Sequence, residues 1–267
     1  AGALDGFTTS QIVALTSSQF SAITTAQIAT LSSTQVAAIQ TADLAALTTA
    51  QAAALTSAQI AALSTSQISN METADIASLS TAALQGLTSA QVAALTTDQI
   101  QALTTRQFTV LRTNQIAALT TDQIAALQTA DLAALSTAQI VGISSSQLVA
   151  LTTNQVQALT TTQIAAIETA DLAKMETADI AALTTAQASA LTSRQVSNLT
   201  TDQISNLETA DVAALSASAI SNMTTAQVVA LTSDQVRALT TSQIASLSTA
   251  WHHLRARWLN LQTERRA

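Results

Sequence analysis

The chain has 267 residues, of which 48% are hydrophobic, 9% are charged and only 2% are aromatic, and its formal net charge is −7. This hydrophobic content argues against a disordered chain, and the acidic balance argues against a nucleic-acid partner, which needs clustered lysine and arginine. Cysteine is absent, which excludes disulfides and thiolate metal sites, and no apolar stretch is long enough for a transmembrane helix.

The first residues already belong to a repeating pattern. Leu4 stands at the sixth position of an eight-residue unit, and Asp5 and Gly6 replace the alanine pair that usually follows. Because no N-terminal cap precedes this unit, we expect the chain to be cut from, or to continue, a longer array.

From Phe7 to Leu247 an eight-residue repeat, or octad, runs without an insertion or a deletion. Its first position is Leu, Ile, Met or Phe, and its sixth is Ile, Val, Leu, Phe or Ala. A fixed short period indicates a repeat architecture, in which each unit packs mainly against its neighbours.

Each octad contains a helix-start signal, which is clear in the octad 119–126. Thr120 is followed three residues later by Gln123, the spacing of a capping box, in which each side chain accepts a hydrogen bond from a backbone amide. Leu119 and Ile124 flank this pair as the two halves of a hydrophobic staple. The sequence therefore predicts one very short helix per octad, and we expect two octads in each superhelical turn.

Other backbone conformations fit the period less well. In a continuous helix, at roughly 100° per residue, the apolar pair would rotate by about 80° per octad and form no stripe. In regular strands the first and sixth positions would face opposite sides of a sheet. A β-solenoid with turns inside each octad escapes this argument and stays open, although glycine occurs only four times and proline not at all.

In six octads the second and fifth positions change together. A long side chain at the second position accompanies a short Asp at the fifth, in the pairs Gln40/Asp43, Glu72/Asp75, Gln128/Asp131, Glu168/Asp171, Glu176/Asp179 and Glu208/Asp211. We infer that the two positions share one hydrogen-bonded space of fixed reach. We also expect the helix cap to move to the threonine that follows, at Thr41, Thr73, Thr129, Thr169, Thr177 and Thr209.

Three further positions of the octad carry signals. The third is Ser or Thr everywhere except at Ala217, so its hydroxyl either caps a helix or pairs with neighbouring octads. The fourth accepts charged residues such as Asp98 and Arg106, which indicates a solvent-exposed position. The eighth is mostly Ala, with Gly86 and Gly142, which suggests close approach between backbones.

The pattern changes at the C-terminus. Apolar residues there follow the a and d spacing of an amphipathic helix, at Trp251, Leu254, Trp258 and Leu261. We predict a helix that covers the last apolar rung, with a partner or membrane-surface helix as the alternative. The predicted domains are thus a repeat solenoid at 1–250 and a basic amphipathic capping helix or tail at 251–267.

Residues that carry chemistry are scarce. His252 and His253 are adjacent, so on a helix they point about 100° apart and cannot chelate one ion together. No histidine lies within the repeats to activate a repeat hydroxyl. We predict no catalytic, cofactor-binding or metal-ligating residue, and no enzyme activity.

Two binding hypotheses compete with a purely structural one. Carboxylates in consecutive octads would suit calcium if they gathered, although swapped cap positions explain them as well, at Glu168, Asp171, Glu176 and Asp179. The ranks of Ser and Thr could bind ice or another surface, but the capping box already employs many of these hydroxyls.

The run from Leu119 to Leu127 resembles the tandem octapeptide segments of very large, repetitive bacterial secreted or surface proteins, and the likeness extends over residues 7–250. The resemblance implies a bacterial stalk or spacer at the cell surface or outside the cell. It carries over no catalytic residue, and the tail from Trp251 has no counterpart in it.

These observations predict an all-α solenoid of very short capped helices, one per eight-residue repeat. The function that we expect is that of a non-enzymatic structural protein, an extended spacer, scaffold or filament element, whose chains could join end to end. The alternative is a binding module that holds a protein partner, or ice or another surface, on its Ser/Thr array.

Overall fold

The computed structural model describes residues 4–246, which form one 3₁₀ helix and thirty α-helices of four to six residues and contain no strand. The predicted all-α solenoid with one short helix per octad is confirmed, and the β-solenoid alternative is wrong. Within residues 4–246, no helix has the length and apolarity needed to cross a membrane. The tail predicted at 251–267 lies outside the described residues.

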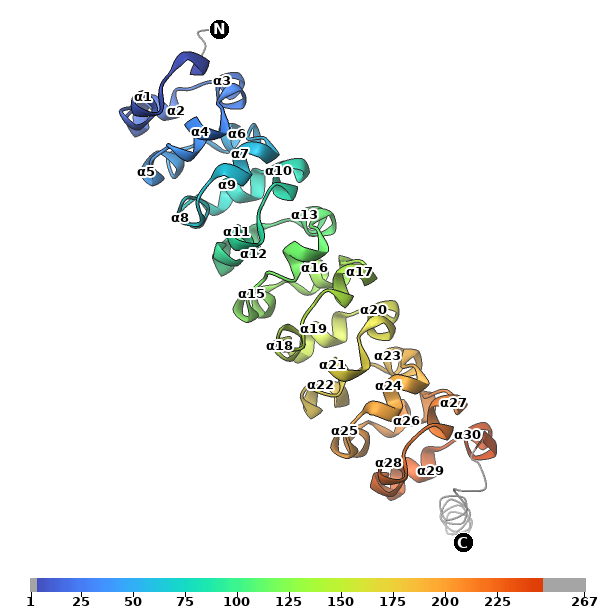
Figure 1. The fold of residues 1–267 in the computed structure, drawn as a ribbon. Helices are drawn as coiled ribbons and strands as arrows, with labels where there is room; N and C mark the ends of the chain where they lie inside the picture. Colours follow the sequence, from blue (N-terminus) through green and yellow to red (C-terminus); the bar gives the residue numbers. More distant parts are fainter. Residues whose placement is uncertain (1–3, 247–267) are drawn as a thin grey trace. The chain divides into compact units, whose positions relative to one another are not determined.

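The chain divides into two compact units, residues 1–135 and 136–267, and the described residues of each wind as a solenoid of short helices (Figure 1). The first unit contains η1 (Leu4–Gly6), α1 (Thr9–Val13), α2 (Ser17–Ser21), α3 (Thr25–Thr30), α4 (Ser33–Ala37), α5 (Thr41–Leu44), α6 (Thr49–Ala53), α7 (Ser57–Ala62), α8 (Thr65–Ser69), α9 (Thr73–Ser78), α10 (Thr81–Gln85), α11 (Ser89–Ala94), α12 (Thr97–Ala102), α13 (Thr105–Val110), α14 (Thr113–Ile116), α15 (Thr121–Ala126) and α16 (Thr129–Ala134).

The second unit continues the same alternation of helix and short link as far as residue 246. Its helices are α17 (Thr137–Val141), α18 (Ser145–Val149), α19 (Thr153–Ala158), α20 (Thr161–Ala166), α21 (Thr169–Leu172), α22 (Thr177–Ala181), α23 (Thr185–Ala190), α24 (Ser193–Asn198), α25 (Thr201–Asn206), α26 (Thr209–Ala214), α27 (Ala217–Ser221), α28 (Thr225–Ala230), α29 (Ser233–Ala238) and α30 (Thr241–Ser246).

The octad sets both ends of its helix, as α15 shows. The Thr120 hydroxyl accepts a hydrogen bond from the backbone amide of Gln123 at 3.2 Å. The backbone amide of Thr120 donates to Gln123 Oε1 at 2.7 Å, which completes the predicted capping box. At the other end Leu127 adopts an extended backbone, with φ −60° and ψ 138°. A helix therefore ends where the apolar residue of the next octad turns the chain back toward the core.

The core consists of the two apolar positions of each octad. Leu119 and Ile124, the two halves of the predicted staple, are both buried, and the same positions are buried in almost every octad. The charged fourth-position residues are exposed, among them Asp98 and Arg106, which confirms the predicted solvent-facing position.

The expected two octads per superhelical turn are wrong. Helices pack against the helices three places away in the chain, as α9 does against α6 and α12. Side-chain hydrogen bonds reach back 28 and 31 residues, which places the turn between three and four octads. Each octad brings two large side chains that need burial, and a turn of only two short helices would leave one of these rows uncovered.

Gly86, at the C-terminal end of α10, shows the close backbone approach that the eighth position predicts. A Cβ at this position would lie 2.2 Å from the carbonyl oxygen of Ser57, which starts α7. Its φ of −72° is ordinary for any residue. The glycine is therefore required by the space between α7 and α10 and not by its backbone conformation.

Candidate functional site

The repeating polar site of the fold is built around the glutamine at the third helical position. Gln123 is only 2% exposed, and its Oε1 accepts the backbone amide of its own helix cap. Its Nε2 donates to the carbonyl oxygens of Val92 at 2.9 Å and Leu95 at 2.6 Å. These carbonyls belong to the C-terminal end of α11, where a helix leaves carbonyl groups without an internal partner.

We call this arrangement the glutamine clamp: the bonds from a third-position Gln Nε2 to backbone carbonyls 28 to 31 residues earlier. It joins the start of one helix to the end of the helix four places before. Among the glutamines that form it are Gln35, Gln51, Gln59, Gln67, Gln91, Gln99, Gln107, Gln115, Gln123, Gln187, Gln195, Gln203, Gln227, Gln235 and Gln243.

The sequence predicted that this glutamine takes part in the capping box but did not predict its bonds to distant carbonyls. Glutamate would complete a capping box equally well, because its carboxylate also accepts the cap amide. Only glutamine adds a donor for the distant carbonyls. The use of Gln and never Glu at the fifth octad position was the signal for the clamp.

We call the six octads with a long polar residue at the second position and Asp at the fifth the swapped octads. Their helix cap does not move to the following threonine, so that prediction is wrong. The cap stays at the second position, where Gln40 and its five counterparts make no side-chain cap bond, and the following threonine is already the first helical residue. The two apolar positions fix where the helix starts, and a change of the polar residues between them does not shift it.

The swapped residues bind earlier octads instead of sharing one local space. Gln40 Nε2 donates to the Val13 carbonyl at 2.6 Å, and Asp43 Oδ1 accepts the Ser17 hydroxyl at 2.7 Å. Gln40 and Asp43 thus make one donor and one acceptor bond to earlier octads, whereas a clamp glutamine accepts its hydrogen bond within its own octad.

The other swapped aspartates follow the same rule in three cases. Each accepts a hydrogen bond from a third-position hydroxyl 26 residues earlier, in the pairs Thr105/Asp131, Ser145/Asp171 and Thr153/Asp179. In these four cases the third-position hydroxyl binds a later octad, whereas the cap of a regular octad is the second-position hydroxyl, as at Thr120.

Asp75 and Asp211 depart from this rule. Both are buried, and no hydrogen bond reaches Asp75 Oδ2 or either carboxyl oxygen of Asp211. Burial raises the pKa of Asp75 to about 6, and the neighbouring charge of Glu72 adds to the effect. Burial also raises the pKa of Asp211.

Smaller effects adjust the pKa of Asp211. The nearby Thr185 hydroxyl lowers this pKa, although it stands outside hydrogen-bond geometry, and the charge of Glu208 raises it. Burial is the largest of the three effects, so the carboxyl is easier to protonate than an ordinary aspartic acid.

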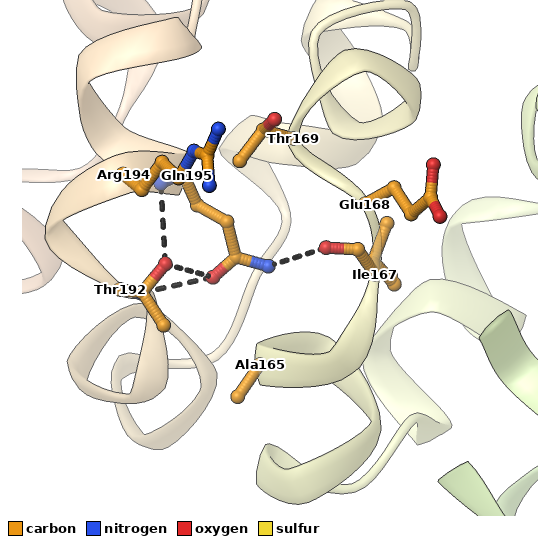
Figure 2. Close-up of a pocket in the computed structure, with 7 residues that line it drawn as sticks. All are labelled: Ala165, Ile167, Glu168, Thr169, Thr192, Arg194 and Gln195. Atoms are coloured by element: carbon orange, nitrogen blue, oxygen red, sulfur yellow. Dashed lines mark hydrogen bonds between the residues drawn. The ribbon is translucent and has the colours of Figure 1, made fainter. Parts of the chain in front are cut away.

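One surface cavity, of about 380 Å³, lies where α24 begins beside the link from α20 to α21. Figure 2 shows Gln195 across its floor, with Nε2 donating to the Ile167 carbonyl at 2.9 Å and Oε1 facing Thr192. Arg194 reaches the cavity from α24 and Glu168 from the link before α21, and both are exposed. This cavity is the open side of one glutamine clamp, and its polar groups do not converge on a point where a substrate atom could sit.

The carboxylates considered for calcium are used separately. Asp171 accepts the Ser145 hydroxyl and lies 3.9 Å from Lys174 Nζ, and Asp179 accepts the Thr153 hydroxyl at 2.8 Å. Across residues 4–246, no three His, Asp or Glu side chains gather where they could hold a metal ion. His252 and His253 lie outside the described residues.

Comparison with known proteins identifies the repeat. A family model described as the ALTTAQ repeat matches six tandem segments, at residues 36–71, 68–105, 101–129, 124–161, 164–201 and 204–241. The letters of that description occur unchanged at residues 46–51 and 182–187. No curated protein matches the chain.

Proposed function

The chain belongs to the ALTTAQ repeat family, and from this we propose that it is a non-enzymatic structural protein whose stacked octads form an extended spacer, scaffold or filament element. The observation that carries the proposal is the glutamine clamp. Glutamine, the most frequent buried polar residue, joins one octad to another, so the repeat is specialised for packing against further copies of itself.

Energetics support an array over a set of independent sites. Burial of two large side chains contributes about 3–6 kcal/mol per octad, whereas ordering eight residues costs on the order of 12 kcal/mol. A single octad cannot fold alone, and stability has to come from contacts between octads such as the clamp. The length of the array can then change without loss of the fold, which suits a spacer.

The setting of this spacer is also part of the proposal. The octapeptide likeness to large bacterial secreted or surface proteins supports a place outside the cell or on its surface. Joining of chains end to end would turn the spacer into a filament element, since a solenoid that adds octads within one chain can add them between chains.

Small-angle scattering of length variants tests the spacer. Extra copies of residues 119–126, inserted after Ala126, should raise the maximum dimension by equal steps, because each copy adds one equivalent unit. The full chain itself should exceed the ~18 Å radius of gyration of a compact protein of this length.

The matched control inserts the same number of Gly and Ser residues at the same place. A flexible segment lengthens only with the square root of its residue number and interrupts the clamp. A radius near 18 Å, or steps that shrink as copies are added, would contradict the proposal. Capture of a partner by the chain at an exposed Ser/Thr face, lost on alanine substitution there, would favour the binding module instead.

A further inference from the structure

Asp75 and Asp211 stand in places that the clamp normally fills with a glutamine. They occupy the third position of α9 and α26, and their exposed fractions are only 2% and 1%. A buried ionised carboxyl group without hydrogen bonds is costly, because nothing replaces the water that it has lost.

The surroundings of these two aspartates contain acceptors without matching donors. In a regular octad, glutamine would donate to the carbonyl 28 residues earlier, which is Leu47 for Asp75 and Leu183 for Asp211. No hydrogen bond reaches either of these carbonyls within the described residues. An ionised aspartate can only accept, so it cannot supply the missing donor.

The cap residues do not supply the donor either. In two of the swapped octads the cap is Gln40 or Gln128, and each donates through Nε2 to a carbonyl 27 residues earlier. At the two exceptional octads the cap is Glu72 or Glu208, which is an acceptor when ionised. Neither cap residue therefore provides a hydrogen for the Leu47 or Leu183 carbonyl.

We propose that Asp75 and Asp211 bind a proton in the folded array in mildly acidic solution, so that each carboxylic acid replaces the clamp glutamine as a combined acceptor and donor. Acidification then tightens the contacts of α9 and α26 with the octads before them. This inference concerns the repeat contacts alone and does not depend on the spacer function.

The charges that face the two sites favour the proton. α9 packs against α6, which has no charged residue, and α12, which carries Asp98; Glu72 precedes α9 itself. None of these elements carries a positive charge, and the charge of Glu72 opposes ionisation of Asp75.

For Asp211 the neighbouring helices are α23, which has no charged residue, and α29, which carries Asp234 and Arg237. Arg237 is paired with Asp234 at 2.8 Å, so its charge is largely offset, and Glu208 adds a negative charge. The balance of charge around Asp211 again opposes its ionisation.

The direction of the pH effect follows from linkage. The pKa of Asp75 is about 6 in the folded chain against 3.8 for the ordinary group. Between these values the folded state binds a proton that the unfolded state does not, so stability rises as the pH falls from about 6 toward 3.8. The gain is complete below the unfolded value and is lost as the pH rises through the folded one.

Carboxyl carbon NMR of the full chain measures the proton directly. Asp75 should titrate near pH 6, and Asp211 should titrate above its ordinary range. Titration of both groups at about 3.9, the value of a free aspartate, would overturn the proposal. This measurement needs no substitution, so it is independent of whether any variant folds.

Hydrogen exchange of the α9 amides, corrected for intrinsic rates, tests the consequence. In the unsubstituted chain the opening equilibrium should fall by up to tenfold per pH unit between pH 6 and pH 4. Asp75→Asn, which is neutral and carries a donor at every pH, should remove that dependence and reduce opening at pH 7.5. Asp131→Asn is the matched control, because Asp131 already accepts a hydrogen bond from the Thr105 hydroxyl. Its effect is measured on the amides of α16, the helix that contains it. If the opening equilibrium of the α9 amides depends on pH equally in Asp75→Asn and in the unsubstituted chain, the proposal is wrong.

Discussion

The side-chain amide of Gln123 donates a 2.6 Å hydrogen bond to the carbonyl oxygen of Leu95, 28 residues earlier in the chain. The same side chain accepts the backbone amide of Thr120 at 2.7 Å. One residue thus satisfies a free donor at the start of its own helix and a free acceptor at the end of another. Helices of four to six residues have mostly end groups, so the fold depends on this double use.

Substitution of Gln123 by Glu should be strongly destabilising. The variant keeps the acceptor for the helix cap but turns a second oxygen toward the Val92 and Leu95 carbonyls in a buried place. We expect a loss of about 3 kcal/mol or more, measured by urea denaturation at pH 7.5. The control is Gln11→Glu, because Gln11 is exposed and caps its helix in the same way. Equal losses in the two variants would show that the clamp bonds contribute nothing.

Substitution of Gly86 by Ala should destabilise α10 although alanine is usually the better helix residue. The added Cβ would meet Ser57 O at 2.2 Å and Ser57 Cα at 2.7 Å, and backbone atoms cannot turn aside as a side chain can. We expect a loss of about 1–3 kcal/mol, from thermal or urea unfolding. Gly6→Ala is the control: nothing lies within 4 Å of its Cβ, so a neutral result or a gain below about 1 kcal/mol is expected.

Substitution of Thr120 and of Thr121 by Ala should show which of the two threonines caps α15. The Thr120 hydroxyl accepts a hydrogen bond from the backbone amide of Gln123 at 3.2 Å, and loss of this bond should lower the free energy of unfolding by about 1 kcal/mol. Thr121 is equally exposed but lies inside α15 at its first position, so Thr121→Ala should change stability by less than about 0.5 kcal/mol. Thr120→Ser keeps the hydroxyl and should restore most of the loss. The reverse order of the two alanine variants would assign the cap to the wrong residue.

The local features of the fold could be predicted from the sequence because one octad contains all of them. The capping residues Thr120 and Gln123, the buried pair Leu119 and Ile124, and the exposed fourth position lie within eight residues of one another. Their interactions are short in sequence, and the physical rules for helix starts apply to them directly.

The packing between octads could not be predicted in the same way. A pattern with a period of eight is unchanged when it is shifted by any number of octads, so it does not encode whether Gln123 meets an octad two or four places back. Its acceptor on Leu95 is a backbone carbonyl, which every residue has. The partner of Asp43 is Ser17, and nearly every octad has a hydroxyl at that position, so no residue pair stood out.

The same shift symmetry predicts which deletions the chain tolerates. Removal of residues 87–94 as one octad leaves each later glutamine of the first unit facing the carbonyls of the previous equivalent octad, so the clamp forms again. We expect far-ultraviolet dichroism per residue to stay unchanged and stability to fall only by the share of one octad. Removal of Ala94 alone changes only the clamps that span it, and it shifts Gln99, Gln107 and Gln115 by one residue against the carbonyls 28 residues earlier. The single-residue deletion should therefore cost more than the eight-residue one, through several broken clamps of about 1 kcal/mol or more each. A larger loss in the octad deletion would mean that octads are not interchangeable and that the contacts depend on particular residues.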